Sequence, residues 1–458
     1  MRKLKKYIHK MATLAILTSS LTFTPSINEL PIIVSVAHAE IKTYIGTDTA
    51  MFDFGEDDEN IVNTVKLCAR TRAEQAAREK AGLYIKSDSR LVNSVLTKDE
   101  ISTITNNILE VVKVEYKKLP YKAYDIQDKS LGKIGLMYEA TVTVKIDTSS
   151  IEKYLNCDEK ERSRLITLNK GINNIINDNN KRFEELNKRS ESASSKQERN
   201  AIKADLAKID RDALYVQKLR EAENAKSNAD RRRLYSEAIS INPNRAEAYV
   251  ARGYSNNGES ALNDFKKAVS VDPNYAPAYF WLGSHYSFDK NYDTSIKYFQ
   301  KAIELDPDYS EAYFQLAIVY RDIKNFQAAI TNFSKVIELK SSSHGSLAYA
   351  IMGDIYGDNL KEYNKAIEAH TKGIQFAIKY PSNAPEVRLI KPIAWNYSSL
   401  GRCYFELKDY KQAIANFNKS IEYGGVKGYC YNKIGDCYKA MGNKTKAEEY
   451  YVKAKSVK

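Results

Sequence analysis

The chain has 458 residues, of which 43% are hydrophobic and 28% are charged. This composition excludes disorder throughout and is sufficient for two or three structural units. The formal charge is +12, of which the first 39 residues contribute +4, and the remaining +8 is interleaved with Glu and Asp. A nucleic-acid-binding surface is therefore not expected.

The chain begins with a basic segment, MRKLKKYIHK, followed by an apolar run, MATLAILTSSLTF. Ala37 and Ala39 form an A-x-A cleavage signal, which predicts that residues 1–39 are a signal peptide removed after Ala39. A retained anchor would need about 20 apolar residues, and Pro25, Glu29 and Pro31 interrupt such a span. We therefore expect an exported protein of the periplasm, cell envelope or exterior, with no transmembrane segment in the mature chain.

Residues 40–151 alternate between extended and helical patterns. IKTYIGTDTAMFDF reads as an extended segment, and DENIVNTVKLCARTRAEQAAREKAGLYI reads as a helix that ends at Gly82. A short helix is expected around TKDEISTITNN, followed by the β-type run ILEVVKVEYKKL. In GLMYEATVTVKID, the alternation of Tyr138, Ala140, Val142 and Val144 predicts a half-buried strand. This order favours a small α+β domain with a mainly antiparallel sheet.

An alanine-rich motif in this region resembles the N-terminal domain of the bacterial flagellar assembly protein T and related envelope lipoproteins. The residues that carry the resemblance are Ala69, Arg70, Ala73, Ala76, Ala77, Arg78, Ala81, Gly82, Val92, Leu96, Asp99, Glu100 and Ile101. The resemblance implies an envelope location and a role in protein association, without catalysis. The other domains of that flagellar protein are not evident in this sequence.

Residues 152–227 form a polar region with two narrow apolar stripes. The first stripe comprises Leu165, Leu168, Ile172, Ile176, Asn179, Phe183 and Leu186, and the second, after SESASS, comprises Ile202, Leu206, Ile209, Ala213 and Val216. Spacings of three and four residues are typical of helices. Two helices with a Ser-rich break between them indicate an antiparallel hairpin or one strand of a coiled-coil dimer, and the break favours the hairpin.

Residues 228–458 contain a pattern that recurs every 34 residues, for example at Phe265 and Phe299 or Pro273 and Pro307. In residues 276–309, one helix carries Tyr279, Leu282, Gly283 and Tyr286, the next carries Ser295, Phe299 and Ala302, and Pro307 follows. This layout resembles the tetratricopeptide repeat, in which paired helices bury their apolar faces only by stacking on neighbours. About six units match, preceded by a degenerate half-unit that ends in Tyr235, Ala238 and Pro243.

Two units depart from the pattern. The unit at 246–275 is four residues short, and the segment SNNGES is expected to shorten its first helix or the turn. The unit around Tyr349 has His370 and Gly373 in place of an aromatic residue and Ala. It is followed by KYPSNAPEVRLIKP, an insertion expected to lengthen the helix pair or form a loop.

The sequence contains no recognisable catalytic, metal-ligating or cofactor-binding motif. Outside the leader, His285, His344 and His370 are too scattered for a metal site. The cysteines, Cys68, Cys157, Cys403, Cys430 and Cys437, lack CxxC spacing and are interpreted as small buried residues. We therefore expect no enzymatic activity and no cofactor.

A stack of helix pairs presents its first helices on a concave wall. The tetratricopeptide resemblance implies that the second, fifth, ninth, twelfth and thirteenth residues of each unit face this wall. The peptide-binding residues predicted in this way are Phe280, Ser284, Phe288, Phe314, Ile318, Arg321, Trp395, Arg402, Phe405, Tyr429, Asn432, Asp436 and Lys439. The alternative for each aromatic residue is packing inside the stack.

The sequence predicts a multidomain protein with a signal peptide at 1–39, an α+β domain at 40–151, a helical hairpin or coiled coil at 152–227 and an all-α tetratricopeptide-repeat solenoid at 228–458. Its expected role is that of an exported, non-enzymatic bacterial scaffold that binds a peptide or helix of an envelope protein. Two alternatives remain: an envelope enzyme whose site lies in a deep polar pocket of the N-terminal domain, and a structural part of a motility or secretion apparatus.

Overall fold

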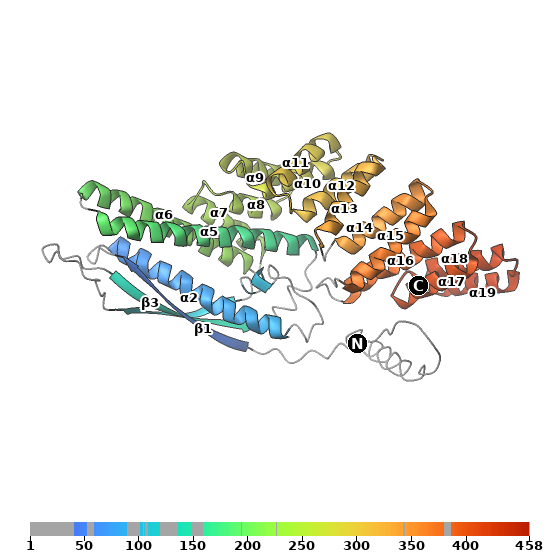
Figure 1. The fold of residues 1–458 in the computed structure, drawn as a ribbon, viewed down its shortest axis with the longest axis horizontal. Helices are drawn as coiled ribbons and strands as arrows, with labels where there is room; N and C mark the ends of the chain where they lie inside the picture. The colour runs from blue at the N-terminus through green and yellow to red at the C-terminus, as the bar shows by residue number, and fades with distance from the viewer. Residues whose placement is uncertain are drawn as a thin grey trace.

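The computed structural model describes residues 41–52, 59–88, 101–103, 105, 109–119, 136–147, 159–193, 195–225, 227–341, 344–379 and 386–457. The predicted signal peptide and Cys157 lie outside these residues. Within the described part, the chain forms a three-stranded sheet with one covering helix, a long helical hairpin and a curved stack of helix pairs (Figure 1).

The N-terminal sheet is antiparallel, with strand order β1-β3-β2. β1 spans Ile41–Phe52, β2 spans Leu109–Lys118 and β3 spans Leu136–Asp147. In β3, Ala140, Val142 and Val144 are fully buried, so the predicted alternating strand is confirmed. The antiparallel sheet that the sequence predicted for this region is therefore confirmed.

Helix α2, Glu59–Asp88, covers one face of this sheet (Figure 1). Its buried face is a column of alanines, Ala69, Ala73, Ala77 and Ala81. These small side chains let the helix backbone approach the sheet so closely that a Cβ at Gly46 would lie 2.0 Å from the carbonyl oxygen of Ala73. The alanine-rich motif therefore specifies the distance between helix and sheet.

The predicted end of this helix at Gly82 is wrong, because α2 continues to Asp88. Gly82 lies inside the helix, beside the short helical segment at 101–103. A Cβ at Gly82 would lie 3.4 Å from Cγ2 of Ile101. The glycine therefore accommodates a packed neighbour instead of ending the helix.

Helices α5, Glu159–Ser192, and α6, Lys196–Glu223, form an antiparallel hairpin within the one chain. Ser195 starts α6 with a capping box: its hydroxyl accepts from the Glu198 amide at 3.1 Å, and the Glu198 carboxylate accepts from the Ser195 amide at 3.0 Å. Both predicted apolar stripes contribute buried residues, among them Ile172 and Leu206. As Figure 1 shows, α2 lies between the sheet and this hairpin.

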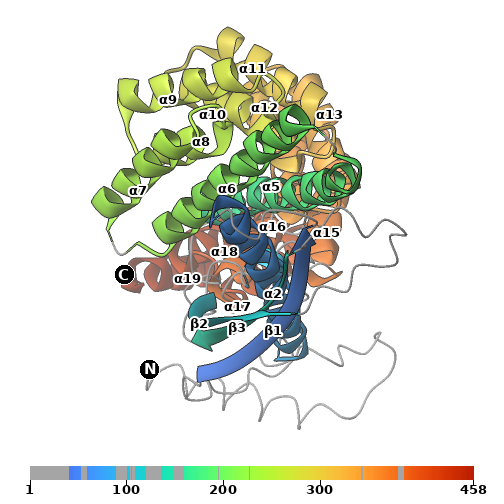
Figure 2. The same ribbon diagram turned by 90° about the vertical axis from the view of Figure 1, so that its left-hand side faces the viewer.

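The remaining helices stack in pairs. The first helices of the pairs are α8 (Ala246–Tyr254), α10 (Ala276–Phe288), α12 (Ser310–Asp322), α14 (Gly345–Asp354), α16 (Glu386–Glu406) and α18 (Lys427–Ala440), and the first helices of such a stack line its inner side. Their partners are α9 (Gly258–Val271), α11 (Tyr292–Leu305), α13 (Phe326–Glu338), α15 (Tyr363–Lys379), α17 (Tyr410–Glu422) and α19 (Lys444–Ser456). Figure 2 shows α9, α11 and α13 outside α8, α10 and α12.

In the pairs α8–α9, α10–α11, α16–α17 and α18–α19, a glycine on the first helix packs against an aromatic ring on the second, and Ala317 takes the place of the glycine in α12. A Cβ at Gly283 would lie 2.8 Å from Cδ1 of Phe299, and a Cβ at Gly401 would lie 2.7 Å from Cε1 of Phe417. Both phenylalanines are fully buried. The roles predicted for these residue types, close approach and filling of the space between helices, are confirmed.

The degenerate half-unit is helix α7, Asn228–Ile241, which packs between α6 and α8. It therefore joins the hairpin to the stack. The short unit has a first helix of 9 residues against 13 in α10, so the shortening falls on the first helix.

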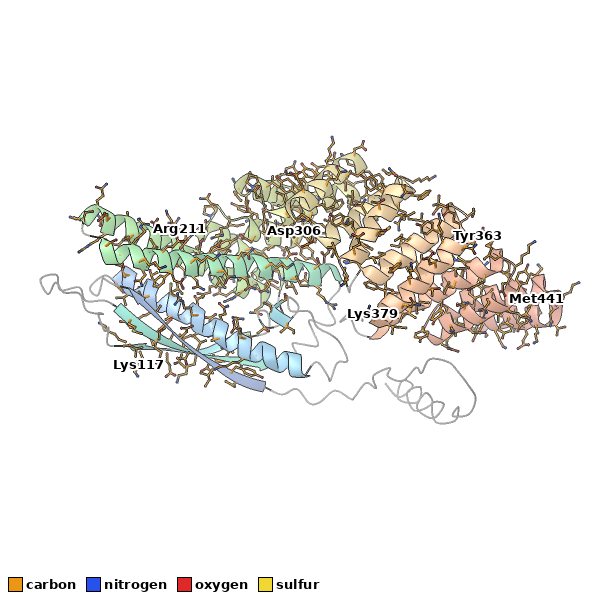
Figure 3. The ribbon with its side chains drawn as sticks, viewed as in Figure 1. Lys117, Arg211, Asp306, Tyr363, Lys379 and Met441 are labelled. Carbon is orange, nitrogen blue, oxygen red and sulfur yellow. The ribbon has the colours of Figure 1, made fainter. Side chains whose placement is uncertain are left out.

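The insertion lies partly outside the described residues, and the helices on its two sides are long: α15 has 17 residues and α16 has 21, whereas α12 and α13 have 13 each. Figure 3 labels Tyr363 and Lys379 at the two ends of α15. In the same unit, His370 occupies the aromatic position and is fully buried over Gly353. The unit thus keeps the packing of a small residue under a ring although its sequence diverges.

Candidate functional site

The concave side of the repeat stack is covered at its N-terminal end by helix α5. Figure 2 shows α5 inside the arc formed by α8, α10 and α12. A Cβ at Gly171 of α5 would lie 2.9 Å from Cγ of Glu247 and 3.6 Å from the hydroxyl of Tyr275, and Tyr309 lies beside Thr167. This part of the inner wall therefore has an occupant from the same chain.

Buried polar contacts attach the hairpin to the stack. The hydroxyl of Tyr215 on α6 accepts from the amide of Ala248 at 2.8 Å and donates to Glu247 at 3.2 Å. Asp212 pairs with Arg245, with an Nη2 to Oδ2 distance of 2.5 Å. Because these groups are buried, separating the hairpin from the stack would leave polar atoms without partners.

Two predicted groove residues of this N-terminal half, Phe280 and Phe314, are buried, with 6% of each side chain exposed. The ring of Phe280 lies 5.1 Å from that of Tyr309 and 5.8 Å from that of Phe299. The ring of Phe314 lies 5.5 Å from that of Phe333. Both side chains fill the stack interior, so the prediction that they line an open groove needs correction.

The other predicted residues of α10 and α12 have varied surroundings. Ser284 and Ile318 are half-buried, and Phe288 is 88% exposed at the end of its helix. Arg321 pairs with its neighbour Asp322 at 2.7 Å. The four residues therefore do not form one continuous accessible surface.

The C-terminal half brings two of the predicted residues of α16, Trp395 and Arg402, together around one carboxylate, that of Asp354 at the end of α14. Trp395 donates from Nε1 to this carboxylate at 2.9 Å, and Arg402 contacts it at 2.6 Å. Arg402 also donates to Asp358 at 2.8 Å. Although burial alone would lower it, the two aspartates raise the pKa of Arg402 above its usual value.

Trp395 remains 40% exposed, and Tyr429 on the neighbouring helix α18 is 38% exposed. We call Asp354, Asp358, Trp395, Arg402 and Tyr429 the aromatic–charged cluster. It lies on the first helices of three consecutive units and combines accessible ring faces with fixed charges. Such a surface can contribute contact area through its rings and register through its charges.

The remaining predicted residues lie around this cluster. Phe405 is half-buried, with its ring 5.5 Å from that of Tyr410. Asn432 and Lys439 are exposed, whereas Asp436 accepts from Tyr451 at 3.0 Å and from Lys433 at 3.1 Å. Asn432, Asp436 and Lys439 extend the polar surface along α18.

Sequence reasoning missed Asp354 and Asp358, because the divergent unit was not assigned groove positions. The ninth and thirteenth positions of that unit, counted from Ser346, are Asp354 and Asp358. The same rule that selected Arg402 at the ninth position of its own unit would therefore have found them. The turn after α14, η2 (Ile355–Asn359), is a π-helical turn, which brings Asp358 within reach of Arg402.

Behind the cluster, His370 is buried beneath Asp354. Its Nδ1 lies 3.0 Å from Oδ1 of Asn396, and its Nε2 lies 3.6 Å from the Asp354 carboxylate. Burial lowers the pKa of His370, and the neighbouring Asp354 opposes that shift. The imidazole is therefore neutral near pH 7 and acts as the ring that packs on Gly353.

A second candidate site is a cavity of about 430 Å³ between α2, β2 and the α5–α6 hairpin. It is lined by Arg70, Glu74 and Cys68 of α2, among others. Three guanidinium groups lower the pKa of Glu74, although burial alone would raise it, and burial raises the pKa of Cys68 to about 12. Neither group is therefore suited to acid–base or nucleophilic chemistry near neutral pH.

The four cysteines within the described residues, Cys68, Cys403, Cys430 and Cys437, are buried and unpaired, as expected. No group of three or more His, Cys, Asp and Glu side chains that could hold a metal ion occurs in the described part of the chain. The same residues contain no helix that is long and apolar enough to cross a membrane.

Comparisons with known proteins support the repeat assignment. Two tetratricopeptide repeat family models match this chain, one at residues 274–342 and the other at residues 396–423 and 429–458. The chain has no match among curated proteins. The resemblance of the N-terminal region to flagellar assembly protein T gains no support from these comparisons and stays a prediction.

Solved structures with partial likeness include a crystal structure of MamA, which is 24% identical, with a TM-score of 0.33 and coverage of 39% of this chain and 89% of that one. YrrB, described as a tetratricopeptide repeat protein with an unusual peptide-binding site, is 18% identical, with a TM-score of 0.34 and coverage of 42% and 90%. PilF of Pseudomonas aeruginosa is 16% identical, with a TM-score of 0.36 and coverage of 50% and 93%. Scores this low carry no argument about function. Together with the stacked helix pairs, the family matches show that the C-terminal half of this chain is built of tetratricopeptide repeats.

Proposed function

We propose that this protein is a non-enzymatic scaffold that binds a peptide or helix of another protein on the C-terminal half of its concave surface. The observation that carries the proposal is the aromatic–charged cluster, which combines exposed rings and ordered charges on consecutive first helices. Tetratricopeptide stacks use this concave side for binding.

The C-terminal location of the proposed binding site is supported by what covers the N-terminal part of the concave wall. Helix α5 lies against the inner side near α8, and Phe280 and Phe314 are packed inside the stack, whereas Phe288, which is 88% exposed, lies at the end of α10. The inner helices α16 and α18 carry Trp395 and Tyr429, both more than one-third exposed. At the C-terminal end, a partner segment can therefore contact two exposed rings that lie beside ordered charges.

The cluster is preorganised for binding. Trp395 is held by its hydrogen bond to Asp354, and Arg402 is held by two carboxylates. Because these side chains are already ordered, binding would cost less conformational entropy than ordering free ones. The mixed charges favour a partner segment that carries both acidic and basic residues beside an apolar anchor.

We further propose that the protein is exported and acts in a bacterial envelope. Support comes from the basic and apolar leader with Ala37 and Ala39 at the cleavage position. The structural alternative, a part of a motility or secretion apparatus, rests on the flagellar resemblance of the alanine-rich motif. The enzyme alternative requires catalytic groups in the N-terminal cavity, and the pKa shifts of Glu74 and Cys68 do not favour them.

Selection of a displayed peptide library against the full chain tests the binding proposal. Peptides that bind the wild type are expected to lose at least about tenfold in affinity, or 1.4 kcal/mol, with Trp395→Ala or Arg402→Glu. The matched control is Ile378→Ala on the outer helix α15, which is 63% exposed and is expected to bind as the wild type does. Selected peptides that do not distinguish Trp395→Ala from Ile378→Ala would refute the proposed site.

A further inference from the structure

The aromatic–charged cluster contains more carboxylates than cations. Asp354 and Asp358 both pair with the guanidinium group of Arg402, at 2.6 Å and 2.8 Å. His370 lies 3.6 Å from Asp354 but is neutral near pH 7, because burial lowers its pKa. No other cation forms an ion pair with either aspartate within the described part of the chain. Two carboxylates therefore share one guanidinium group.

The two carboxylates differ in how many hydrogen bonds they already accept. Oδ1 of Asp354 accepts from Arg402 at 2.6 Å and from Ser399 at 2.9 Å, and its Oδ2 is the acceptor of the indole hydrogen bond described above. Oδ2 of Asp358 accepts from Arg402, whereas its Oδ1 accepts no hydrogen bond from the described residues. The side chain of Asp358 is 52% exposed, against 22% for Asp354. Asp358 is therefore the carboxylate that a partner can reach.

Two aromatic rings of the cluster are accessible as well. Trp395 is 40% exposed, and because its Nε1 already donates to Asp354, what the ring offers a partner is its apolar surface. Tyr429 is 38% exposed. Burial raises the pKa of Tyr429 and the charge of Arg402 opposes that shift, so the phenol lies within electrostatic reach of the charged groups. Rings of Trp and Tyr attract cations to their faces.

The arrangement distinguishes basic from acidic side chains of a partner. An acidic side chain that approaches Arg402 meets Asp354 and Asp358, which already accept from both of its terminal nitrogens. A basic side chain that approaches Asp358 completes the pairing of charges and can lie against a ring. Repulsion of one charge and attraction of the other together make such a surface selective.

We propose that the partner segment docks with a lysine or arginine side chain that pairs with Asp358 and lies against the exposed rings of Trp395 and Tyr429. This inference rests on the proposed function, because it identifies the chemistry of the segment that binds at the same cluster. An acidic residue of that segment has its counter-charge outside the cluster, at Lys439, which is exposed on α18.

Short peptides from a random display library, selected against the full chain, are the probes. In each selected peptide, every lysine and arginine is replaced in turn by glutamine, and dissociation constants are measured with the wild type, Asp358→Asn and Asp293→Asn. We expect one basic residue whose replacement weakens binding to the wild type at least about tenfold but changes binding to Asp358→Asn less than about twofold. Asp293, an exposed aspartate of the outer helix α11, is the matched control, so its variant should keep the tenfold effect.

A second variant tests the ring contact. Tyr429→Leu keeps an apolar side chain and removes the ring face, so it should weaken binding of the basic peptide more than binding of its glutamine version. This comparison decides the matter even if Asp358→Asn does not fold.

The outcomes separate this inference from the proposed function. Selected peptides can depend on Trp395 and yet contain no basic residue that is coupled to Asp358 or Tyr429; that result would overturn the inference and leave the binding site in place. Peptides whose binding is unchanged by Trp395→Ala would remove the site itself, and the inference with it.

Discussion

Replacing Phe280 with alanine distinguishes a packed ring from a groove-facing one. The side chain is 6% exposed and contacts the rings of Phe299 and Tyr309. Burial of a phenylalanine contributes about 1.5–3 kcal/mol, and each aromatic pair adds about 0.5–1.5 kcal/mol. Because the cavity left behind collapses only in part, we expect a loss of about 3–5 kcal/mol in the free energy of unfolding of this part of the stack.

The matched control lies on the same helix. Phe288 is 88% exposed, so Phe288→Ala is expected to change the free energy of unfolding by less than about 0.5 kcal/mol. Urea unfolding in a Trp395→Phe background, followed by the fluorescence of Trp281, whose ring lies 5.2 Å from that of Phe280, reports on this region. A loss below about 1 kcal/mol for Phe280→Ala would show that the ring is not part of the stack interior.

Three further predictions concern the hairpin, the divergent unit and the leader. Tyr215→Phe removes the buried acceptor of the Ala248 amide, and chemical denaturation should show a loss of about 1–3 kcal/mol. Because burial holds the pKa of His370 below 6.5, the unfolded state binds more protons than the folded state in acid. The free energy of unfolding should therefore fall as the pH drops below 6.5. In urea titrations at several pH values, His370→Phe should reduce this fall. Mass spectrometry of the protein from its native host should find Glu40 at the N-terminus, and a chain that keeps the leader would contradict cleavage after Ala39.

The repeat architecture was predictable because its requirements are local. A small residue at Gly283 and a ring at Phe299 recur at fixed spacing, and each pair of helices repeats the same contact. The strand alternation around Val142 and the capping box at Ser195 are local in the same sense. Patterns of this kind determine helices, strands and pairwise packing without reference to distant parts of the chain.

Gly82 shows where local reasoning fails. A glycine at that point commonly ends a helix, but here it makes room for a segment near Ile101, so the helix continues. The prediction that Phe280 and Phe314 line the groove was wrong for a similar reason. Their place in the repeat indicated the inner side of the stack, whereas their exposure depended on neighbouring helices.

The sequence by itself determined the repeats, the antiparallel sheet and the polar helices between them. Only the tertiary structure decided that α5 lies against the inner wall, that Asp354 gathers Trp395 and Arg402, and that Arg220 joins the arginines of α2. The physical reason is that helix spacing and apolar periodicity act within a few turns of chain. Burial and charge balance, in contrast, depend on side chains that are distant in sequence and meet only when the units pack.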